Sequence, residues 1–250
     1  MSLKIQYIGH STVLIESGGV TLLTDPVLSH RLFWIKRQSP LPINPGDLPQ
    51  PTAILISHAH YDHLDFPSFK YVTSQVPVIV PVGLKRLVSK FLGNPVTEME
   101  TGSEISPGEG LTIRSFRVTH PGFRILPFRY TGCNGYLITL NGYKIFFPGD
   151  TAYRSDFREL AKERIDVALL PIGCYQPEWF MKKRHTNPAE AIQIFEEIGA
   201  KQMIPIHWGT FKLSTEPLDE PPLLLDRLAS EKGIRERVKI LKHGESFIVK

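Results

Sequence analysis

The sequence predicts a layered α/β protein, and the order of its apolar segments is the main reason. Strand-like runs come first, and strands that alternate with helix-like segments follow, an order that favours sheets covered by helices over a helical bundle or a β-sandwich. With 250 residues, of which 42% are hydrophobic, the chain is long enough to bury a sizeable core. We expect a single domain that covers residues 1–250.

Several short apolar runs are typical of strands. "KIQYI", "TVLIE" and "VTLLT" follow one another near the start, and the Gly18-Gly19 pair between the second and third predicts a hairpin turn. After a proline-rich loop, "AILIS" (53–57) has the length and branching of a buried strand. "GYLITLNGYKIFF" predicts a second hairpin around Asn141-Gly142.

Two segments predict helices. "LKRLVSKF" (84–91) has the apolar spacing of one helical face. "TNPAEAIQIFEEIG" (186–199) has clear start and stop signals, because Asn187 can cap it, Pro188 suits its first turn, Glu190 fits a capping box and Gly199 can end it. The strands predicted for "VALLPI" and "QMIPI" flank this second helix.

Composition restricts the partners and the compartment. The formal charge of +4 is modest and is spread along the chain, so we expect no nucleic-acid partner. No apolar run reaches the roughly 18 residues that span a bilayer, and no secretory signal is visible at the amino terminus. Cys133 and Cys174 lie too far apart in sequence for a Cys-x-x-Cys motif. We therefore expect a cytoplasmic protein. The sequence leaves open whether it forms a homo-oligomer.

Titratable residues follow four of the apolar runs. Behind "ILIS", "TIRSFRVT", "KIFFPG" and "MIPI" stand, in order, His58, His120, Asp150 and His207. Strand ends are where a rigid scaffold presents its site residues to a crevice. These four side chains are therefore candidates for a common site.

The segment "HAHYDH" carries the strongest signal for a metal. It packs His58, His60, Asp62 and His63 into six residues, and imidazole and carboxylate groups suit zinc and similar divalent ions. A tight loop after a strand can aim the first two histidines at one ion and turn Asp62 and His63 to a second. A catalytic zinc needs three protein ligands and one open position. The further donors for two such sites would come from His120, Asp150 and His207.

These motifs resemble the metallo-β-lactamase superfamily of dinuclear hydrolases, in particular "HAHYDH", "FPGDTAY" and "IPIHWGTF" in this order. The resemblance implies a four-layer αββα sandwich with its site at one edge of the two sheets. It also implies two zinc ions per chain, although Mn²⁺ or Fe would fit the same donors. The first ion would be bound by His58, His60 and His120, the second by Asp62, His63 and His207, and both by Asp150. His60 stands where the flavodiiron redox members usually carry Glu, which favours zinc hydrolysis.

A narrower resemblance points to a substrate class. "GHSTVLIE", "LLTDPVLSHR", "LLPIGCYQPEWFMKKRHTNPAEA" and "LKHGES" are similar to the N-acyl-phosphatidylethanolamine-hydrolysing phospholipase D branch. This implies a phosphodiesterase that cleaves a lipid or another organophosphate ester with a metal-bridging hydroxide. The alternative is a lactonase or other carbonyl-ester hydrolase, like the ascorbate-phosphate lactonases. An RNA-processing nuclease is disfavoured, because the chain lacks the extra nuclease domain of such enzymes.

Three residues, one of them already named as a metal ligand, are candidates for roles in catalysis. Asp62 could orient the hydroxide or act as a ligand alone. Asp25, in "LLTDP", could hold a ligand imidazole by its free N–H or could cap a turn before Pro26. By resemblance His185, in "KKRHTNP", lies near the site and could contact the scissile group or protonate a leaving oxygen. Otherwise it is a solvated histidine in a basic run.

Further residues could support the ligands, begin a helix or contact lipid. His10 and Thr151 could be partners of the ligands. We expect Asp65 to mark the start of a helix near Phe66 and not to bind a metal. The run "RLFWIKR" (31–37) mixes aromatic and basic residues, which would allow peripheral contact with lipid headgroups, or it could pack onto the protein body.

Overall fold

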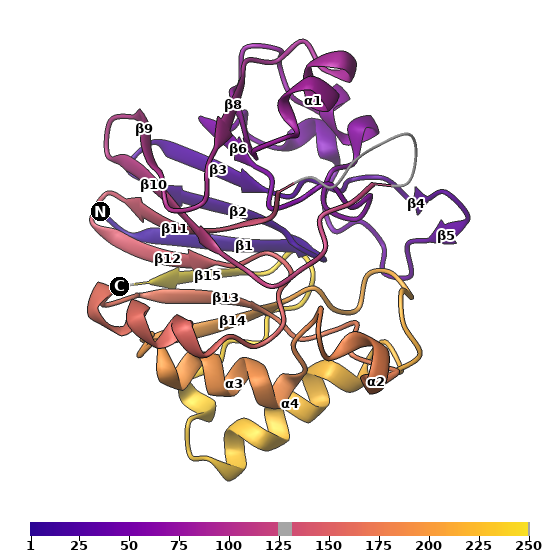
Figure 1. The fold of residues 1–250 in the computed structure, drawn as a ribbon, viewed down its shortest axis with the longest axis vertical. Coiled ribbons are helices and arrows are strands. Elements are labelled where there is room, and N and C mark those ends of the chain that lie inside the picture. The colour runs from indigo at the N-terminus through magenta and orange to yellow at the C-terminus, as the bar shows by residue number, and fades with distance from the viewer. Residues whose placement is uncertain (125–131, 250) are drawn as a thin grey trace.

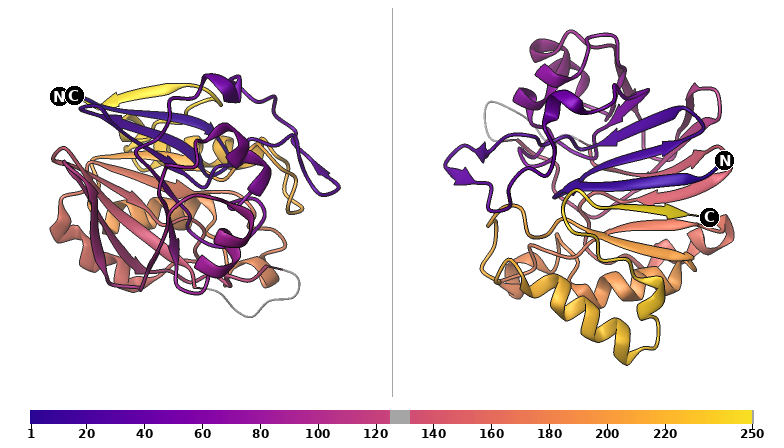
Figure 2. Two further views of the ribbon diagram at one scale, coloured as in Figure 1. Left: turned by 90° about the horizontal axis from the view of Figure 1, so that it is seen from above. Right: turned by 180° about the vertical axis from the view of Figure 1, so that it is seen from behind.

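The computed structural model describes residues 1–124 and 132–249. Two β-sheets face each other at the centre of the molecule, and helices cover their outer faces (Figures 1 and 2). The first sheet has seven strands, in the order β15 (Ser246–Val249), β1 (Leu3–Gly9), β2 (Thr12–Ser17), β3 (Val20–Thr24), β6 (Ala53–Leu55), β7 (Val78–Pro81) and β8 (Val96–Met99).

The second sheet has six strands, and a short hairpin projects from the body on its own (Figure 1). In order, the second sheet contains β14 (Gln202–Ile206), β13 (Val167–Pro171), β12 (Tyr143–Phe147), β11 (Asn134–Leu140), β10 (Leu111–Arg117) and β9 (Glu104–Gly108). The projecting hairpin consists of β4 (Arg31–Leu32) and β5 (Ile35–Lys36).

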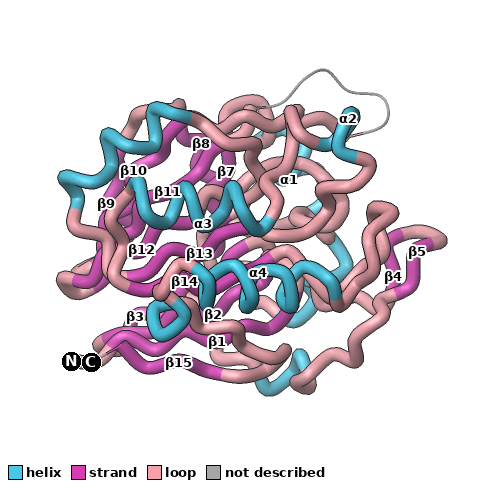
Figure 3. The backbone as a smooth tube through the Cα atoms, turned by 90° about the horizontal axis from the view of Figure 1, so that it is seen from below, coloured by secondary structure: helices cyan, strands magenta, loops and turns pink. Residues whose placement is uncertain are grey.

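Helices form the two outer layers. The α-helices are α1 (Lys85–Phe91), α2 (Glu178–Met181), α3 (Pro188–Glu197) and α4 (Glu220–Glu231). Short 3₁₀ helices cover Pro45–Asp47, Phe66–Tyr71, Ser155–Glu163 and Arg235–Arg237. Figure 3 shows α3 and α4 side by side over the second sheet. Within the described residues, no helix is both long and apolar enough to cross a membrane.

Alternation along the central strands explains why their sequences are apolar throughout. In β6, Ala53 and Leu55 pack between the two sheets, whereas Ile54 packs outward with Val88 of α1. In β13, Leu169 points between the sheets and Leu170 outward to the layer of α3. A strand that buries both faces has no polar alternate positions, so it reads as a continuous hydrophobic run.

Three separate apolar layers result from this alternation, one between the sheets and one under each helical layer. The predicted αββα sandwich is therefore confirmed. Helix α3 begins where its capping residues predict. The Asn187 side chain accepts from the Glu190 N–H, and the Glu190 side chain accepts from the Asn187 N–H. The segment after Asp65 is a 3₁₀ helix, and Asp65 caps it without a side-chain bond to the backbone.

Candidate metal centre

Strand direction gathers the site residues at one edge of the sandwich. Strands β1, β3 and β6 of the first sheet run the same way, and so do β10, β12 and β14 of the second. The residues that follow their carboxyl ends are His10, Asp25 and His58 in the first sheet and His120, Asp150 and His207 in the second. The loop that follows β6 adds His60, Asp62 and His63.

Three imidazoles form the first cluster. His60 Nδ1 lies 2.9 Å from His58 Nε2 and 3.0 Å from His120 Nε2. His120 is held by its other nitrogen, because its Nδ1–H donates to the Arg184 carbonyl at 2.9 Å. This fixes the tautomer that leaves Nε2 with a lone pair turned toward the cluster.

A carboxylate and two imidazoles form the second cluster. Asp62 Oδ2 lies 3.5 Å from His63 Nε2 and also 3.5 Å from His207 Nε2. Both histidines are buried. Among the described residues, neither Nε2 atom makes a well-directed hydrogen bond, and the groups nearest to them are carboxylate oxygens at 3.2–3.5 Å. A cation bound between these atoms would use their lone pairs.

Asp150 lies between the two clusters. Its Oδ2 is 3.2 Å from His63 Nε2 and 3.3 Å from His207 Nε2 in the second cluster. The same oxygen is 4.0 Å from His58 Nε2 and 3.9 Å from His120 Nε2 in the first. One carboxylate oxygen therefore faces imidazoles of both clusters.

Asp25 supports one histidine of each cluster from behind. Its Oδ2 accepts from His63 Nδ1 at 2.7 Å and from the Ser57 hydroxyl at 2.6 Å, and its Oδ1 accepts from the Ser57 N–H at 2.7 Å. Ser57 Oγ in turn lies 2.9 Å from His58 Nδ1. A fully buried carboxylate thus orients His63 directly and His58 through a hydroxyl.

The electrostatics of the site suit a cation. Burial by itself would lower the pKa of His63, but the carboxylates of Asp150 and Asp62 raise it well above its usual range. Burial would likewise raise the pKa of Asp150, yet the His207 and His63 imidazoles hold it well below its usual range. Positive charge is therefore stabilised between the carboxylates, where the imidazole nitrogens converge. The histidine and aspartate groups could hold metal ions.

The remaining predicted residues take different positions. His185 is buried beside the clusters, with Nδ1 3.6 Å from Asp150 Oδ2 and its ring 4.9 Å from that of His120. Asp65 accepts from the hydroxyls of Ser29 and Ser68, away from both clusters. Thr151 accepts from the Thr119 N–H and so ties together the loops that carry His120 and Asp150.

Sequence reasoning missed two supports of the centre. Ser57 is an ordinary hydroxyl at the end of a predicted strand, and only the long-range pairing with Asp25 gives it a role. The acceptor for His120 is a backbone carbonyl, that of Arg184, which no side-chain pattern can indicate. The sequence indicates His10 only as a candidate partner of the predicted ligands, and in the structure its Nε2 lies 2.8 Å from Asp62 Oδ2.

Comparisons with known proteins show the family of this chain. Residues 21–208 match the family described as beta-lactamase superfamily domain. The chain is 35% identical, over 88% of its length, to N-acyl-phosphatidylethanolamine-hydrolyzing phospholipase D 1 of Caenorhabditis elegans, of which it covers 69%. It is 33% identical, over 92% of its length, to a mitochondrial protein of the same description from Saccharomyces cerevisiae, of which it covers only 53%.

A solved structure supports the fold. A metallo hydrolase from the archaeon Ignicoccus hospitalis superposes with a TM-score of 0.77 at 19% identity, covering 100% of this chain and 99% of that one. The superposition supports the fold alone, and the matched family and the relatives lead to the assignment. The chain belongs to the beta-lactamase superfamily and is a metal-dependent hydrolase related to the N-acyl-phosphatidylethanolamine-hydrolysing phospholipases D.

Proposed function

We propose that the chain is a dinuclear zinc phosphodiesterase that acts on a lipid or another organophosphate ester. The observation that carries the proposal is the position of Asp150, whose Oδ2 faces imidazoles of both clusters at 3.2–4.0 Å. The phospholipase D description of the relatives at 33–35% identity supports a phosphodiester substrate.

The donor set fits two divalent ions. His58, His60 and His120 would hold the first ion, and Asp62, His63 and His207 would hold the second. Asp150 would contact both. Imidazole with a minority of carboxylate is a donor set that suits zinc. Ions bound there would polarise the scissile bond and lower the pKa of a bound water.

The protein's own groups then position the reaction. Asp62 would orient the nucleophile from its place beside Asp150, in addition to its role as a ligand. Burial lowers the pKa of His185 to about 4 against the opposing effect of Asp150. The ring is therefore neutral at pH 7, so we assign it the donation of a hydrogen bond to the leaving-group oxygen, and delivery of a full proton is not required.

Replacing His185 by alanine is expected to lower kcat by about 100-fold, as removal of one transition-state hydrogen-bond donor does elsewhere. Metal content should stay at the wild-type value, because four donor atoms surround each ion without His185. Steady-state kinetics measure the loss of kcat, and metal analysis checks that the metal content is unchanged. The matched control is His30→Ala, since His30 is exposed and outside the site. Loss of metal would make His185 a ligand, and an unchanged kcat would remove it from the reaction.

Exposed aromatic residues beside the site support a lipid substrate. Phe33 and Trp34, at the tip of the β4–β5 hairpin, are 60% and 80% exposed. The Phe33 ring is 4.3 Å from that of Tyr61, which lies between the metal-binding residues of the β6 loop. Lys36 adds a basic group on the same hairpin. Exposed aromatic rings with flanking bases suit the boundary of an anionic membrane, so we infer peripheral contact there.

Changing both Phe33 and Trp34 to alanine is expected to weaken binding to anionic phospholipid vesicles by at least about tenfold, because two large apolar groups leave the interface. Cleavage of a water-soluble diester should not change. Vesicle sedimentation and a soluble-substrate assay measure the two effects. Leu223→Ala serves as control, since Leu223 is also exposed but lies on α4. Equal vesicle binding by the double variant and the wild type would exclude the hairpin as the contact.

Substrate class is tested by one panel. The zinc-loaded protein is assayed with a chromogenic phosphodiester, a phosphomonoester, a lactone and a thioester, beside an N-acyl phosphatidylethanolamine in mixed micelles. We expect kcat/KM for the diesters to exceed that for the other esters by more than about tenfold. A preference for the lactone or the thioester would overturn the phosphodiesterase proposal and favour the carbonyl-ester hydrolase.

A further inference from the structure

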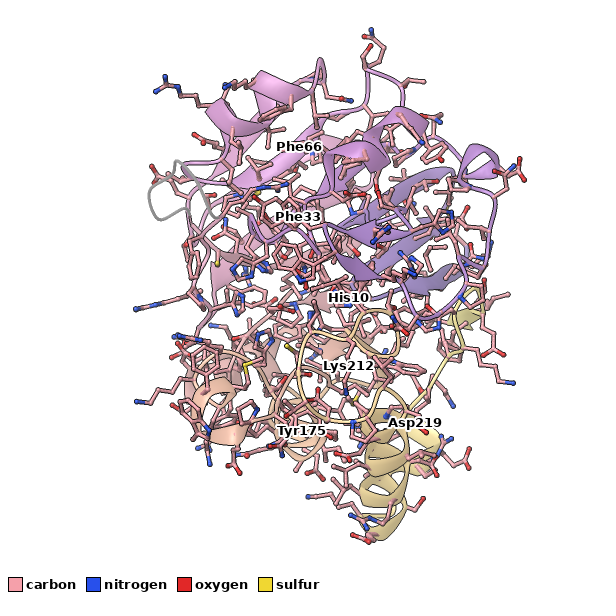
Figure 4. All side chains as sticks on the ribbon, turned by 90° about the vertical axis from the view of Figure 1, so that its right-hand side faces the viewer. His10, Phe33, Phe66, Tyr175, Lys212 and Asp219 are labelled. Atoms are coloured by element: carbon pink, nitrogen blue, oxygen red, sulfur yellow. The ribbon has the colours of Figure 1, made fainter. Side chains whose placement is uncertain are left out.

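His10 lies in the turn between β1 and β2, behind the second cluster. Its side chain is buried, and its φ of 56° is in the left-handed region. Figure 4 labels it near the middle of the molecule, between Phe33 and the loop of Lys212. A left-handed backbone is uncommon for a residue that carries a side chain, although asparagine, aspartate and histidine are enriched there. The side-chain contacts of His10 therefore have to show what the imidazole does at this position.

Two of those contacts go to the second cluster. His10 Nε2 lies 2.8 Å from Asp62 Oδ2, the oxygen that also faces His63 and His207. The His10 ring packs against the His207 ring, with 4.0 Å between centroids. A single side chain thus touches the carboxylate and one imidazole of this cluster.

The backbone of His10 bonds the loop that follows β14. Its carbonyl accepts from the His207 N–H at 2.7 Å, and its own N–H donates to Thr210 Oγ1 at 2.8 Å. His207 is itself in the left-handed region, at φ 59°. Strained backbone persists where the surrounding contacts determine it. The turn of His10 and the loop of His207 therefore hold each other in place.

A ligand role for His10 fits less well than a supporting one. Asp62, His63, His207 and Asp150 already provide four donor atoms for the second ion, and a catalytic ion must keep a position open for water. A further imidazole would occupy that position. When Nε2–H donates to Asp62 Oδ2, the same nitrogen has no lone pair left for a metal.

We propose that His10 is a positioning residue of the second metal position, which orients Asp62 by hydrogen bonding and supports His207 by packing. The inference rests on the proposed dinuclear function and deepens it. His10 sets the affinity of the second ion, and it leaves the first cluster of His58, His60 and His120 unaffected.

The structure offers a matched pair of variants. In His10→Asn, asparagine suits the left-handed backbone. Its amide nitrogen reaches only as far as the imidazole Nδ1 and so cannot bond Asp62. His10→Gln extends an amide N–H to about the depth of Nε2 and can restore the bond to Asp62. His243→Gln is the control, because His243 Nε2 contacts Thr210 Oγ1 at 3.0 Å, in the same loop region.

A third variant uses the neighbouring space. His10 lines a small pocket that is partly open to solvent, together with Cys174, Phe211 and Leu213. His10→Gly suits the left-handed backbone and enlarges this pocket by the volume of an imidazole. Free imidazole should therefore enter and restore the hydrogen bond to Asp62.

The test measures zinc binding to the metal-free protein by competition with a chromogenic chelator, without any substrate. We expect His10→Asn to bind the weaker of two zinc ions about 10- to 100-fold less tightly, the usual effect of losing an outer partner of a ligand. The tighter ion should bind as in the wild type. His10→Gln should recover to within about threefold, His10→Gly should recover with imidazole, and His243→Gln should match the wild type.

Three results would overturn the inference. Two ions bound with wild-type affinity by His10→Asn would remove the role of His10. If His10→Asn and His10→Gln both bind the two ions equally less tightly, and the metal-free variants have a lower Tm, the role of His10 is purely structural. A visible Co²⁺ spectrum that loses one nitrogen ligand in His10→Gln would make it a direct ligand. If the wild type itself binds only one ion, the dinuclear proposal fails first, which separates the two failures.

Discussion

Replacing Asp150 by asparagine is expected to lower hydrolysis by more than about 100-fold while the fold survives. Loss of a residue that only hydrogen-bonds a metal ligand lowers metal affinity or activity by about 10- to 100-fold. A larger effect is expected here because Asp150 is proposed to contact both ions directly. The amide removes the negative charge that His63 and His207 face at 3.2 and 3.3 Å. Steady-state kinetics of the zinc-loaded variant measure the effect.

Fold survival is expected because asparagine has nearly the shape of aspartate. Circular dichroism and thermal unfolding of the metal-free variant check this point. Asp166→Asn is the matched control, since Asp166 is also a buried aspartate but bonds the Lys144 N–H and the Lys201 ammonium outside the site. Hydrolysis by the Asp150 variant at the wild-type rate would refute its contact with both ions.

Asparagine in place of Asp25 is expected to weaken metal binding and hydrolysis by about 10- to 100-fold. The Asp25 carboxylate accepts three hydrogen bonds, from His63 Nδ1 and from the N–H and the hydroxyl of Ser57. An amide has one acceptor oxygen, so its NH₂ group must turn toward one of these donors. If it turns toward His63, the ring proton moves to Nε2 and blocks the nitrogen that would bind the second ion.

Zinc titration of the metal-free Asp25→Asn protein checks this expectation. Ser57→Ala separates the effect of Asp25 on His58 from its effect on His63, because it removes the hydroxyl between Asp25 and His58 and keeps the direct bond to His63. Binding of the first ion should therefore be weakened more than binding of the second in the alanine variant. Wild-type zinc affinity in Asp25→Asn would leave Asp25 with only a role in its turn.

Much of the fold follows from local patterns. Runs such as "AILIS" and "VALLPI" are apolar because both faces of their strands are buried, and the capping box of α3 is a purely local signal. The residues that meet at the sheet edge were also predictable, since strand ends present side chains in one direction. His58, Asp150 and His207 follow this rule.

The sequence indicates supporting roles for His10 and Asp25, but it does not indicate which residues they contact, because these contacts join residues far apart in sequence. Asp62 meets His10 across 52 positions, and Asp25 meets Ser57 across 32. No periodicity specifies such pairs. The exposure of Phe33 and Trp34 had two open interpretations, since one composition suits a packed loop and a surface hairpin alike.

Metal content tests the central claim most directly. Purified protein is stripped with a chelator, reconstituted with excess Zn²⁺, freed of unbound ions and analysed by mass spectrometry, with Asp150→Asn in parallel. Two clusters that share Asp150 predict close to two zinc ions per wild-type chain and a clear loss in the variant. One ion or none in the reconstituted wild type would contradict the dinuclear centre.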